Sequence, residues 1–319
     1  MIEVKNLTKR YGNHLAVDHL NFTVESGKIY GFLGPNGAGK STTMNIMTGY
    51  LGATEGQVLI DGHDILKEPE EAKKNIGYLP EIPPLYMEMT VLEYLEFAAE
   101  LKGIKKDKRE PQIEEVIRLA KLRDVENRLI QNLSKGYKQR VGLAQAVLGF
   151  PEIIILDEPT VGLDPKQIIE IRELIRKLAK KHTVILSSHI LAEVREVCDY
   201  IMIISGGKLV ASDTTENLEN MMSGKGQIEV EAKASRDEMD HIIRRTEKIK
   251  EVKYRTSASG ITTAQIIAKG GEDIREELFL AFSHADVPML TLNQSKTTLE
   301  EIFLELTQGS GNRMIKEEK

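Results

Sequence analysis

The sequence contains little cysteine. Cys198 is the only cysteine among 319 residues, so an internal disulfide and a cysteine-based metal cluster are both excluded, and a reducing compartment is expected. Because Cys198 follows Leu191 and Val194 at helical spacing, we predict a buried core thiol and not a nucleophile.

The sequence also lacks an excess of basic charge and any long hydrophobic run. Its 43 Lys and Arg against 49 Asp and Glu give a net charge of -6, which disfavours nucleic acid as the main partner. The longest apolar runs, residues 153–156 and 201–204, are far shorter than the ~20 residues of a membrane-spanning helix. The N-terminus has no signal-peptide pattern, so we expect a cytoplasmic protein.

The most informative stretch follows an apolar run at residues 29–33. Residues 34–41 read Gly-Pro-Asn-Gly-Ala-Gly-Lys-Ser, which fits G-x-x-x-x-G-K-[ST], the phosphate-binding P-loop. The apolar run predicts a buried parallel strand, and residues 42–49 predict a helix whose positive end faces the loop. The alternative is a glycine-rich turn that matches by chance.

In a P-loop, glycines let backbone N–H groups converge on phosphate oxygens. Lys40 would then reach the β and γ phosphates of a bound nucleotide, and the Ser41 hydroxyl would bind Mg²⁺. We expect Lys40 to lie outside the hydrophobic core. The predicted nucleotide-binding residues here are Gly34, Pro35, Asn36, Gly37, Ala38, Gly39, Lys40, Ser41 and Thr42.

A second acidic site follows the buried-strand pattern at residues 153–156. Asp157 fits the Walker B role of holding Mg²⁺. Glu158, at the strand tip beside a γ-phosphate, could orient and deprotonate a water. Such a base favours a hydrolase over a kinase, whereas a simple strand-ending turn is the alternative.

Strands alternate with helices up to about residue 220, which predicts an α/β fold with a P-loop (RecA-like) parallel sheet and antiparallel edge strands. The block at about residues 83–149 reads as all-helical and predicts a subdomain inserted into this domain. Within it, Thr90 and Glu93 form a capping box. We expect the basic segment from Lys105 to Arg109 to be a solvated linker.

A second pattern begins at about residue 227. Its order of strands and helices, βαββαβ, predicts a ferredoxin-like α+β module at residues 227–308. Ser235 with Glu238 caps its first helix, and Thr297 with Glu300 caps a final one. We expect residues 309–319 to form a disordered tail.

Residues 1–220 resemble the ATP-binding cassette (ABC) ATPase family. Residues 133–140, Leu-Ser-Lys-Gly-Tyr-Lys-Gln-Arg, are similar to the family's signature segment Leu-Ser-Gly-Gly-Gln, and residues 161–164 are similar to its D-loop. His189 matches the switch histidine, and Tyr11 matches the aromatic that stacks on adenine. The five motifs in this order make the resemblance highly specific.

The resemblance implies a mechanism that uses two cassettes. In the family, two cassettes close head to tail over two ATP molecules. Ser134 and Gly136 would contact the γ-phosphate held by the other cassette, and Asp164 would cross the interface. His189 would also contact the γ-phosphate.

Three positions depart from the family pattern. Lys135 replaces a signature glycine, Tyr137 replaces the signature glutamine, and Glu81 replaces the Q-loop glutamine. A carboxylate at position 81 can still bind Mg²⁺ or its water. In the family, the adjoining surface receives short helices of the permease. Residues 81–90 would form that surface here, with a cluster of large apolar side chains at Leu85, Tyr86, Met87 and Met89. The alternative is that this cluster packs under the inserted helices as core.

These features resemble the ATPase subunits of bacterial ABC-2 type exporters, which include sodium-extrusion, antibiotic-resistance and gliding-motility types. We therefore expect an ATP-hydrolysing subunit that pairs with a second cassette and drives a separate membrane permease from the cytoplasmic face. A soluble ABC protein acting on ribosomes or DNA is the alternative. Such proteins usually carry two fused cassettes or long coiled coils, and neither pattern occurs here. Glu158 and the signature segment argue against a third possibility, a P-loop kinase.

Overall fold

The computed structural model describes residues 1–218, 227–257, 260–295 and 303. Its contacts divide the chain into two compact units, of which the first covers Met1–Thr215 and the second begins at Glu216.

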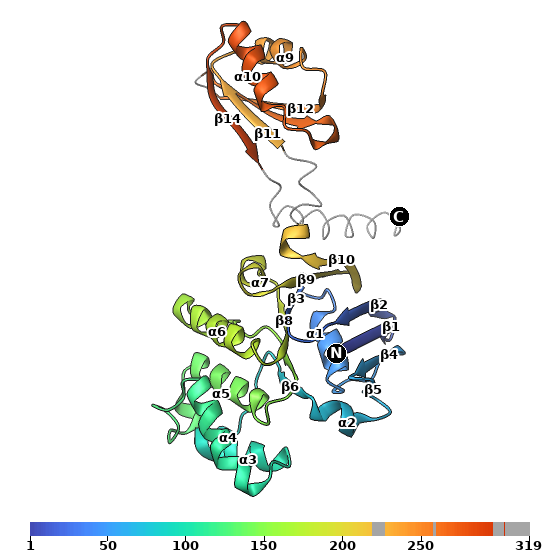
Figure 1. The fold of residues 1–319 in the computed structure, drawn as a ribbon, viewed down its shortest axis with the longest axis vertical. Coiled ribbons are helices and arrows are strands. Elements are labelled where there is room, and N and C mark those ends of the chain that lie inside the picture. Colours follow the sequence, from blue (N-terminus) through green and yellow to red (C-terminus); the bar gives the residue numbers. More distant parts are fainter. Residues whose placement is uncertain (219–226, 258–259, 296–302, 304–319) are drawn as a thin grey trace. The chain divides into compact units, whose positions relative to one another are not determined.

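The centre of the first unit is a six-stranded sheet (Figure 1). From edge to edge its strands are β10 (Lys208–Thr214), β9 (Tyr200–Ser205), β3 (Ile29–Leu33), β8 (Thr183–Ser188), β7 (Ile153–Leu156) and β6 (Ile76–Leu79). Strands β9 to β6 run parallel, and β10 is antiparallel to β9. Every side chain of β3, β7 and β8 is buried, as expected for parallel strands covered on both faces.

The remaining strands form a separate antiparallel sheet. Its order is β2 (His14–Val24), β1 (Ile2–Tyr11), β4 (Glu55–Ile60) and β5 (His63–Asp64). The prediction that antiparallel strands flank the parallel sheet is therefore correct only for β10. Strand β1 bonds to β2 on one side and to β4 on the other, and such nonlocal pairing leaves no local sequence signal.

Helices join the two sheets into one core. Their bounds are α1 (Lys40–Met47), α2 (Pro69–Lys74), α6 (Pro165–Leu178) and α7 (Leu191–Val197). Figure 1 shows α6 and α7 on the face of the six-stranded sheet opposite α1. The buried Met44 of α1 shares a hydrophobic cluster with Val4 of β1 and Ile155 of β7. The P-loop helix is thus held between both sheets.

The elements between β6 and β7 are all helical. They are α3 (Val91–Leu101), α4 (Lys106–Leu119), the 3₁₀ turn η1 (Ile130–Asn132) and α5 (Lys135–Val147). The capping box of Thr90 and Glu93 is confirmed at the start of α3.

The predicted basic linker after α3 is wrong, because α4 already begins at Lys106. Lysine and arginine are good helix formers, and α4 forms even though Pro111 lies inside it, where the ring removes one backbone hydrogen bond and crowds the preceding turn. The guanidinium of Arg109 also donates to the Ile104 carbonyl at 2.8 Å and pairs with Glu100 at 3.6 Å. The segment is therefore fixed against the end of α3.

The second unit follows the order βαββαβ. Its main elements are β11 (Gln227–Ala232), α9 (Arg236–Ile243), β12 (Ile249–Thr256), β13 (Thr262–Ala268), α10 (Arg275–His284) and β14 (Met289–Ser295), with a 3₁₀ turn, η2 (Lys269–Gly271), before α10. The sheet order is β12-β13-β11-β14, antiparallel throughout. Met239 of α9 and Phe282 of α10 pack in one core with the strands. The predicted cap at Ser235 is confirmed; the predicted final helix and tail lie outside the described residues, apart from Phe303.

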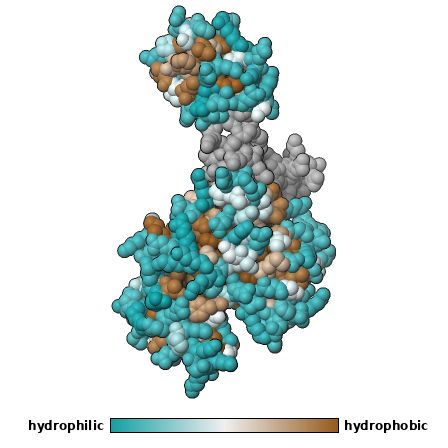
Figure 2. All heavy atoms as spheres, viewed as in Figure 1, coloured by the Kyte–Doolittle hydropathy of each residue, from teal (hydrophilic) through white to brown (hydrophobic). Residues whose placement is uncertain are grey.

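The visible surface of both units is mainly hydrophilic, with scattered hydrophobic residues (Figure 2). Within the described ranges, no helix has both the length and the apolar character needed to cross a membrane.

Candidate functional site

The glycine-rich loop connects the buried strand β3 to α1. Gly39 is the N-cap of α1 and has φ 103°. A Cβ there would lie 2.6 Å from the Ala16 carbonyl oxygen, so only glycine fits this backbone and this approach. The free N–H groups that begin α1 form an anion-binding end at this loop.

Lys40 is the first residue of α1, and its side chain is only 5% exposed. Lys40 is thus a buried polar residue beside the hydrophobic cluster that contains Met44, which agrees with the prediction that it lies outside the hydrophobic core. Its Nζ donates to the Gly34 carbonyl at 2.8 Å and to the Pro35 carbonyl at 3.3 Å, which offsets the cost of burying an ammonium group. The same Nζ lies 3.5 Å from Oε1 of Glu158.

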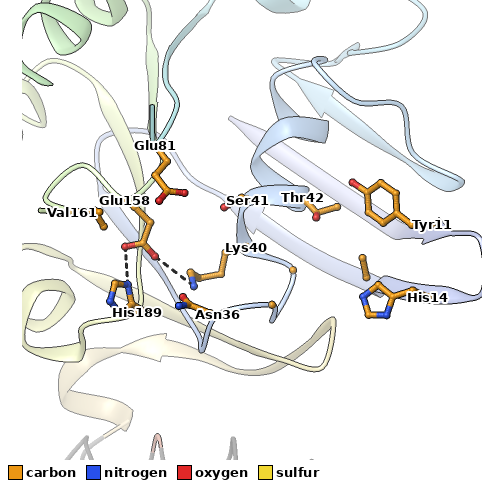
Figure 3. A pocket seen from close by; sticks show the side chains of 13 residues that line it. Tyr11, His14, Asn36, Lys40, Ser41, Thr42, Glu81, Glu158, Val161 and His189 are labelled. Carbon is orange, nitrogen blue, oxygen red and sulfur yellow. Dashed lines mark hydrogen bonds and ion pairs between the residues drawn. The ribbon is translucent and has the colours of Figure 1, made fainter. Parts of the chain in front are cut away.

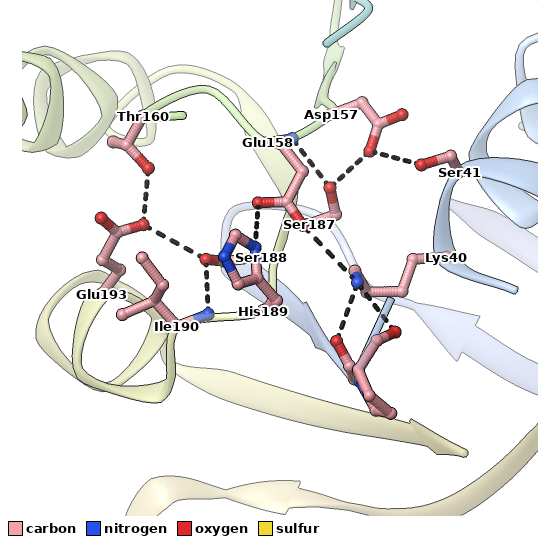
Figure 4. A network of polar contacts seen from close by, with 12 residues as sticks. Lys40, Ser41, Asp157, Glu158, Thr160, Ser187, Ser188, His189, Ile190 and Glu193 are labelled. Carbon is pink, nitrogen blue, oxygen red and sulfur yellow. Dashed lines mark hydrogen bonds and ion pairs between the residues drawn. The ribbon is translucent and has the colours of Figure 1, made fainter. Parts of the chain in front are cut away.

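A hydroxyl pair converges on the buried Asp157. Ser41 Oγ donates to Asp157 Oδ1 at 3.2 Å, and Ser187 Oγ donates to the same oxygen at 2.5 Å. The backbone N–H of Glu158 in turn donates to Ser187 Oγ at 2.8 Å. The ends of β7 and β8 are therefore linked to the start of α1 through side-chain oxygens (Figure 4).

Glu158 has φ 47°, a left-handed conformation that costs a non-glycine residue about 1–2 kcal/mol. Its Oε2 lies 3.0 Å from Nδ1 of His189. Because an ionised carboxylate can only accept, this contact places a proton on Nδ1. The other ring nitrogen, Nε2, is then left for a further partner.

Lys40, Glu158 and His189 border one cavity of ≈ 500 Å³. Figure 3 shows Tyr11 and His14 on one side, Glu158 and His189 on the other, and Lys40 between them. Its lining residues are Tyr11, His14, Ala16, Asn36, Gly37, Gly39, Lys40, Ser41, Thr42, Glu81, Glu158, Val161 and His189. Ten of the predicted site residues are thus brought together, and Asp157 is bonded to one of them.

Some predicted residues support the cavity without lining it. Gly34 and Pro35 supply the carbonyls that hold Lys40, and the Ala38 N–H donates to the Pro35 carbonyl at 3.1 Å. The sequence analysis missed His14, Ala16 and Val161. The only sequence feature that could have identified them is their closeness in the chain to predicted site residues: His14 and Ala16 follow Tyr11, and Val161 follows Glu158.

Three further predicted residues, Ser134, Gly136 and Asp164, do not line the cavity. Ser134 is exposed and caps α5 by accepting from the Tyr137 N–H. Asp164 likewise caps α6 by accepting from the Gln167 N–H. A Cβ on Gly136 would lie 2.5 Å from the Gln167 side chain of α6, so α5 and α6 pack closely at this point.

The unusual Tyr137 is held by contacts of its own. Its hydroxyl donates to Asp124 Oδ2 at 2.6 Å, and this hydrogen bond raises the pKa of the phenol. The Arg140 guanidinium lies 5.7 Å from the Tyr137 ring centre and forms an ion pair with Glu170 of α6. The tyrosine is therefore accommodated within a polar network beside the start of α5.

Comparisons with known proteins agree with this geometry. The family model described as "ABC transporter" matches residues 17–161. The chain is 42% identical to the bacitracin transport ATP-binding protein BcrA of Bacillus licheniformis, covering 69% of this chain and 71% of that protein. It is 34% identical to the lantibiotic transport ATP-binding protein SrtF of Streptococcus pyogenes, covering 70% of this chain and 97% of that protein.

A solved structure shows the same fold. It is a dimeric, post-hydrolysis ATP-binding cassette bound to ADP and Pi, with a TM-score of 0.61 and 29% identity over 67% of this chain and 98% of that one. The sequence motifs, the residues that line the cavity and these relatives all indicate the same family. The chain therefore belongs to the family of ABC transporter ATP-binding proteins.

Proposed function

We propose that the cavity binds Mg²⁺–ATP and that hydrolysis there powers a separate membrane permease, with export as the direction of transport. As a member of its family, the chain is an ATP hydrolase. The observation that carries the proposal is the position of the Glu158 carboxylate, 3.5 Å from Lys40 Nζ and 3.0 Å from His189 Nδ1 at the cavity.

The residues present fit a magnesium ion. Ser41 and Asp157 offer oxygen atoms 3.2 Å apart, and Glu81 lines the same cavity. Mg²⁺ takes few protein ligands and completes its shell with water and phosphate oxygens, so a hydroxyl and one or two carboxylates suffice from the protein. When bound, the ion would neutralise charge on the phosphates.

The remaining groups divide the chemistry between them. Lys40 would hold the β and γ phosphates, and Asn36, Gly37 and Thr42 would supply further donors from the loop. Glu158 would accept a proton from the attacking water. His189, oriented by Glu158, would place Nε2 toward the γ-phosphate. The exposed ring of Tyr11 would stack on adenine.

A second cassette would complete the site. Ser134, Gly136 and Asp164 do not line the cavity of their own chain, which supports a role at the nucleotide of a partner. The free N–H groups at the start of α5 can serve an anion there. The dimeric ATP-binding cassette structure described above supports the same assembly.

The permease would dock on the surface at residues 81–90. Tyr86 is 51% exposed and Met87 38%, whereas Leu85 and Met89 are half-buried. A neighbouring groove of ≈ 810 Å³ is lined by Ile82 and Glu81 and also by Ser41 and Asp157. A partner seated there would therefore contact the same residues that face the metal, which supports coupling between transport and hydrolysis.

We also assign the chain's parts as follows. Residues 1–220 form the ATPase domain, with a helical subdomain at about 83–149, and residues 227–308 form a ferredoxin-like module. The order β12-β13-β11-β14 in the second unit supports the last assignment. In this proposal the protein lies on the cytoplasmic face of the membrane, held by the permease, and nucleic acid is not a partner.

Co-purification from detergent-solubilised membranes tests this function. The protein should bring down a multi-span membrane protein. Recovery of ribosomes or DNA in its place would support the alternative, a soluble ABC ATPase.

A further inference from the structure

Glu193 of α7 is a buried carboxylate outside the cavity lining, with 7% of its surface exposed. Its Oε2 accepts from Thr160 Oγ1 at 2.5 Å and from Ser188 Oγ at 3.2 Å (Figure 4). A buried carboxylate is tolerated only with such donors. Both donors are themselves buried, so these hydrogen bonds are shielded from water.

The two donors belong to different segments beside the cavity: Thr160 lies in the loop after β7, and Ser188 is the last residue of β8. Thr160 lies two residues after Glu158 and directly before Val161, which lines the cavity. Ser188 directly precedes His189, and its Oγ also accepts from the Ile190 N–H at 3.0 Å. Ser188 precedes His189 in the chain and its hydroxyl holds the backbone of Ile190, which follows His189. Glu193 in turn holds the Ser188 hydroxyl.

We propose that Glu193 is a positioning residue for hydrolysis, which joins the His189 loop to the segment at residues 160–164 so that the two move together. This inference rests on the proposed role of His189. Without the shared acceptor, the Thr160 and Ser188 hydroxyls would form hydrogen bonds with separate partners. The segment at residues 160–164 and the His189 loop would then move independently. A displacement of about 1 Å at a reacting group can reduce the rate by 10².

The geometry supplies a discriminating pair of variants. Both donors use the same oxygen, so the amide oxygen of Glu193→Gln can take its place and preserve the link. Glu193→Leu keeps the size but removes the acceptor. We expect Glu193→Leu to lower kcat for ATP by about 10- to 100-fold with KM changed less than about twofold, and Glu193→Gln to stay within about threefold of the wild type.

ATPase assays well below the melting temperature measure these effects. A purely structural role would lower the melting temperature of Glu193→Leu and leave kcat unchanged. Thr160→Val breaks the same link from the other side, so its loss of kcat should not add to that of Glu193→Leu. Glu196→Leu, an exposed position on the same helix, is the control and should behave as the wild type.

The outcomes separate the two claims. If His189→Ala and Glu158→Gln retain full activity, the proposed catalytic roles fail. If those variants lose activity while Glu193→Leu and Thr160→Val keep the wild-type kcat, the positioning role alone is overturned. Should Glu193→Leu fail to fold, Thr160→Val decides: a lower kcat supports the link, and an unchanged one rejects it.

Discussion

Oε2 of Glu158 lies 3.0 Å from Nδ1 of His189, and Oε1 of the same carboxylate lies 3.5 Å from Nζ of Lys40. Both carboxylate oxygens thus face donors from separate segments of the chain. A water aligned by Glu158 for attack on a phosphate would bind the same carboxylate as Lys40 Nζ and His189 Nδ1. The position of the base is therefore set jointly by the P-loop and by the end of β8.

Replacing Glu158 with glutamine tests the base directly. Glu158→Gln keeps the shape but cannot accept the proton, so turnover should fall by roughly 10²–10⁴ while ATP still binds. The variant should also accumulate as a closed dimer in ATP, visible by size-exclusion chromatography. Glu152→Gln, an exposed position before β7, is the control. Normal ATPase activity in Glu158→Gln would refute the assigned role.

Replacing Lys40 tests nucleotide capture. Lys40→Ala removes the charge meant for the phosphates, so ATP binding or hydrolysis should collapse. Because Nζ also donates to the buried Gly34 carbonyl and to the Pro35 carbonyl, unfolding should become easier by about 1–3 kcal/mol. Calorimetry and ATPase assays measure the two effects, and Lys67→Ala, whose side chain is 79% exposed, is the control. Equal hydrolysis rates in Lys40→Ala and the wild type would contradict the prediction.

The docking surface is tested at Tyr86 and Met87. Tyr86→Ala and Met87→Ala should weaken association with the permease while the melting temperature changes little, because both side chains are partly exposed. Tyr86 has an edge-to-face contact with Phe97 at 5.3 Å, worth about 0.5–1.5 kcal/mol. Phe279→Ala, an equally exposed aromatic in the second unit, is the control. A large loss of stability with intact association would assign the cluster to the core.

Cys198 should not react in the native protein. It is buried, and burial raises the pKa of its thiol, so the reactive thiolate is both rare and inaccessible. A chromogenic thiol reagent should therefore modify one group per chain only after denaturation. Ser212→Cys, which adds an exposed thiol, should give one fast and one slow group. Rapid labelling of the wild type would show that α7 opens readily.

The same thiol makes stability depend on pH. Above its ordinary pKa of 9.0, the unfolded chain loses a proton that the native chain keeps. At Cys198 the native chain then binds more protons than the unfolded chain, so the free energy of unfolding falls as the pH rises. Urea titrations at pH 8 and pH 10 should show a larger loss for the wild type than for Cys198→Ala. Parallel losses would disprove the linkage.

The sequence was most informative where chemistry depends on consecutive residues. The P-loop and the caps at Thr90 and Ser235 could be located from short patterns, and the structure confirms both caps. The buried thiol at Cys198 was likewise predictable from helical spacing, and it is confirmed.

Features that depend on nonlocal contacts could not be predicted. The separate antiparallel sheet depends on β1 pairing with β4, about fifty residues away. Glu193 was missed for the same reason, because its donors lie thirty-three and five residues away and no motif joins them. The helical start of α4 was missed because its basic composition also suits a loop.

Gly31, in the middle of β3, determines how near α7 can approach the sheet. A Cβ at this position would lie 2.3 Å from Val194 Cγ1 and 2.8 Å from Cys198 Sγ. Val194 follows Glu193 directly, so any side chain at residue 31 would push away the helix that carries the carboxylate. The packing of α7 against β3 thus excludes a side chain at residue 31. Because glycine has none, α7 lies close enough to the sheet for Glu193 to make its hydrogen bonds.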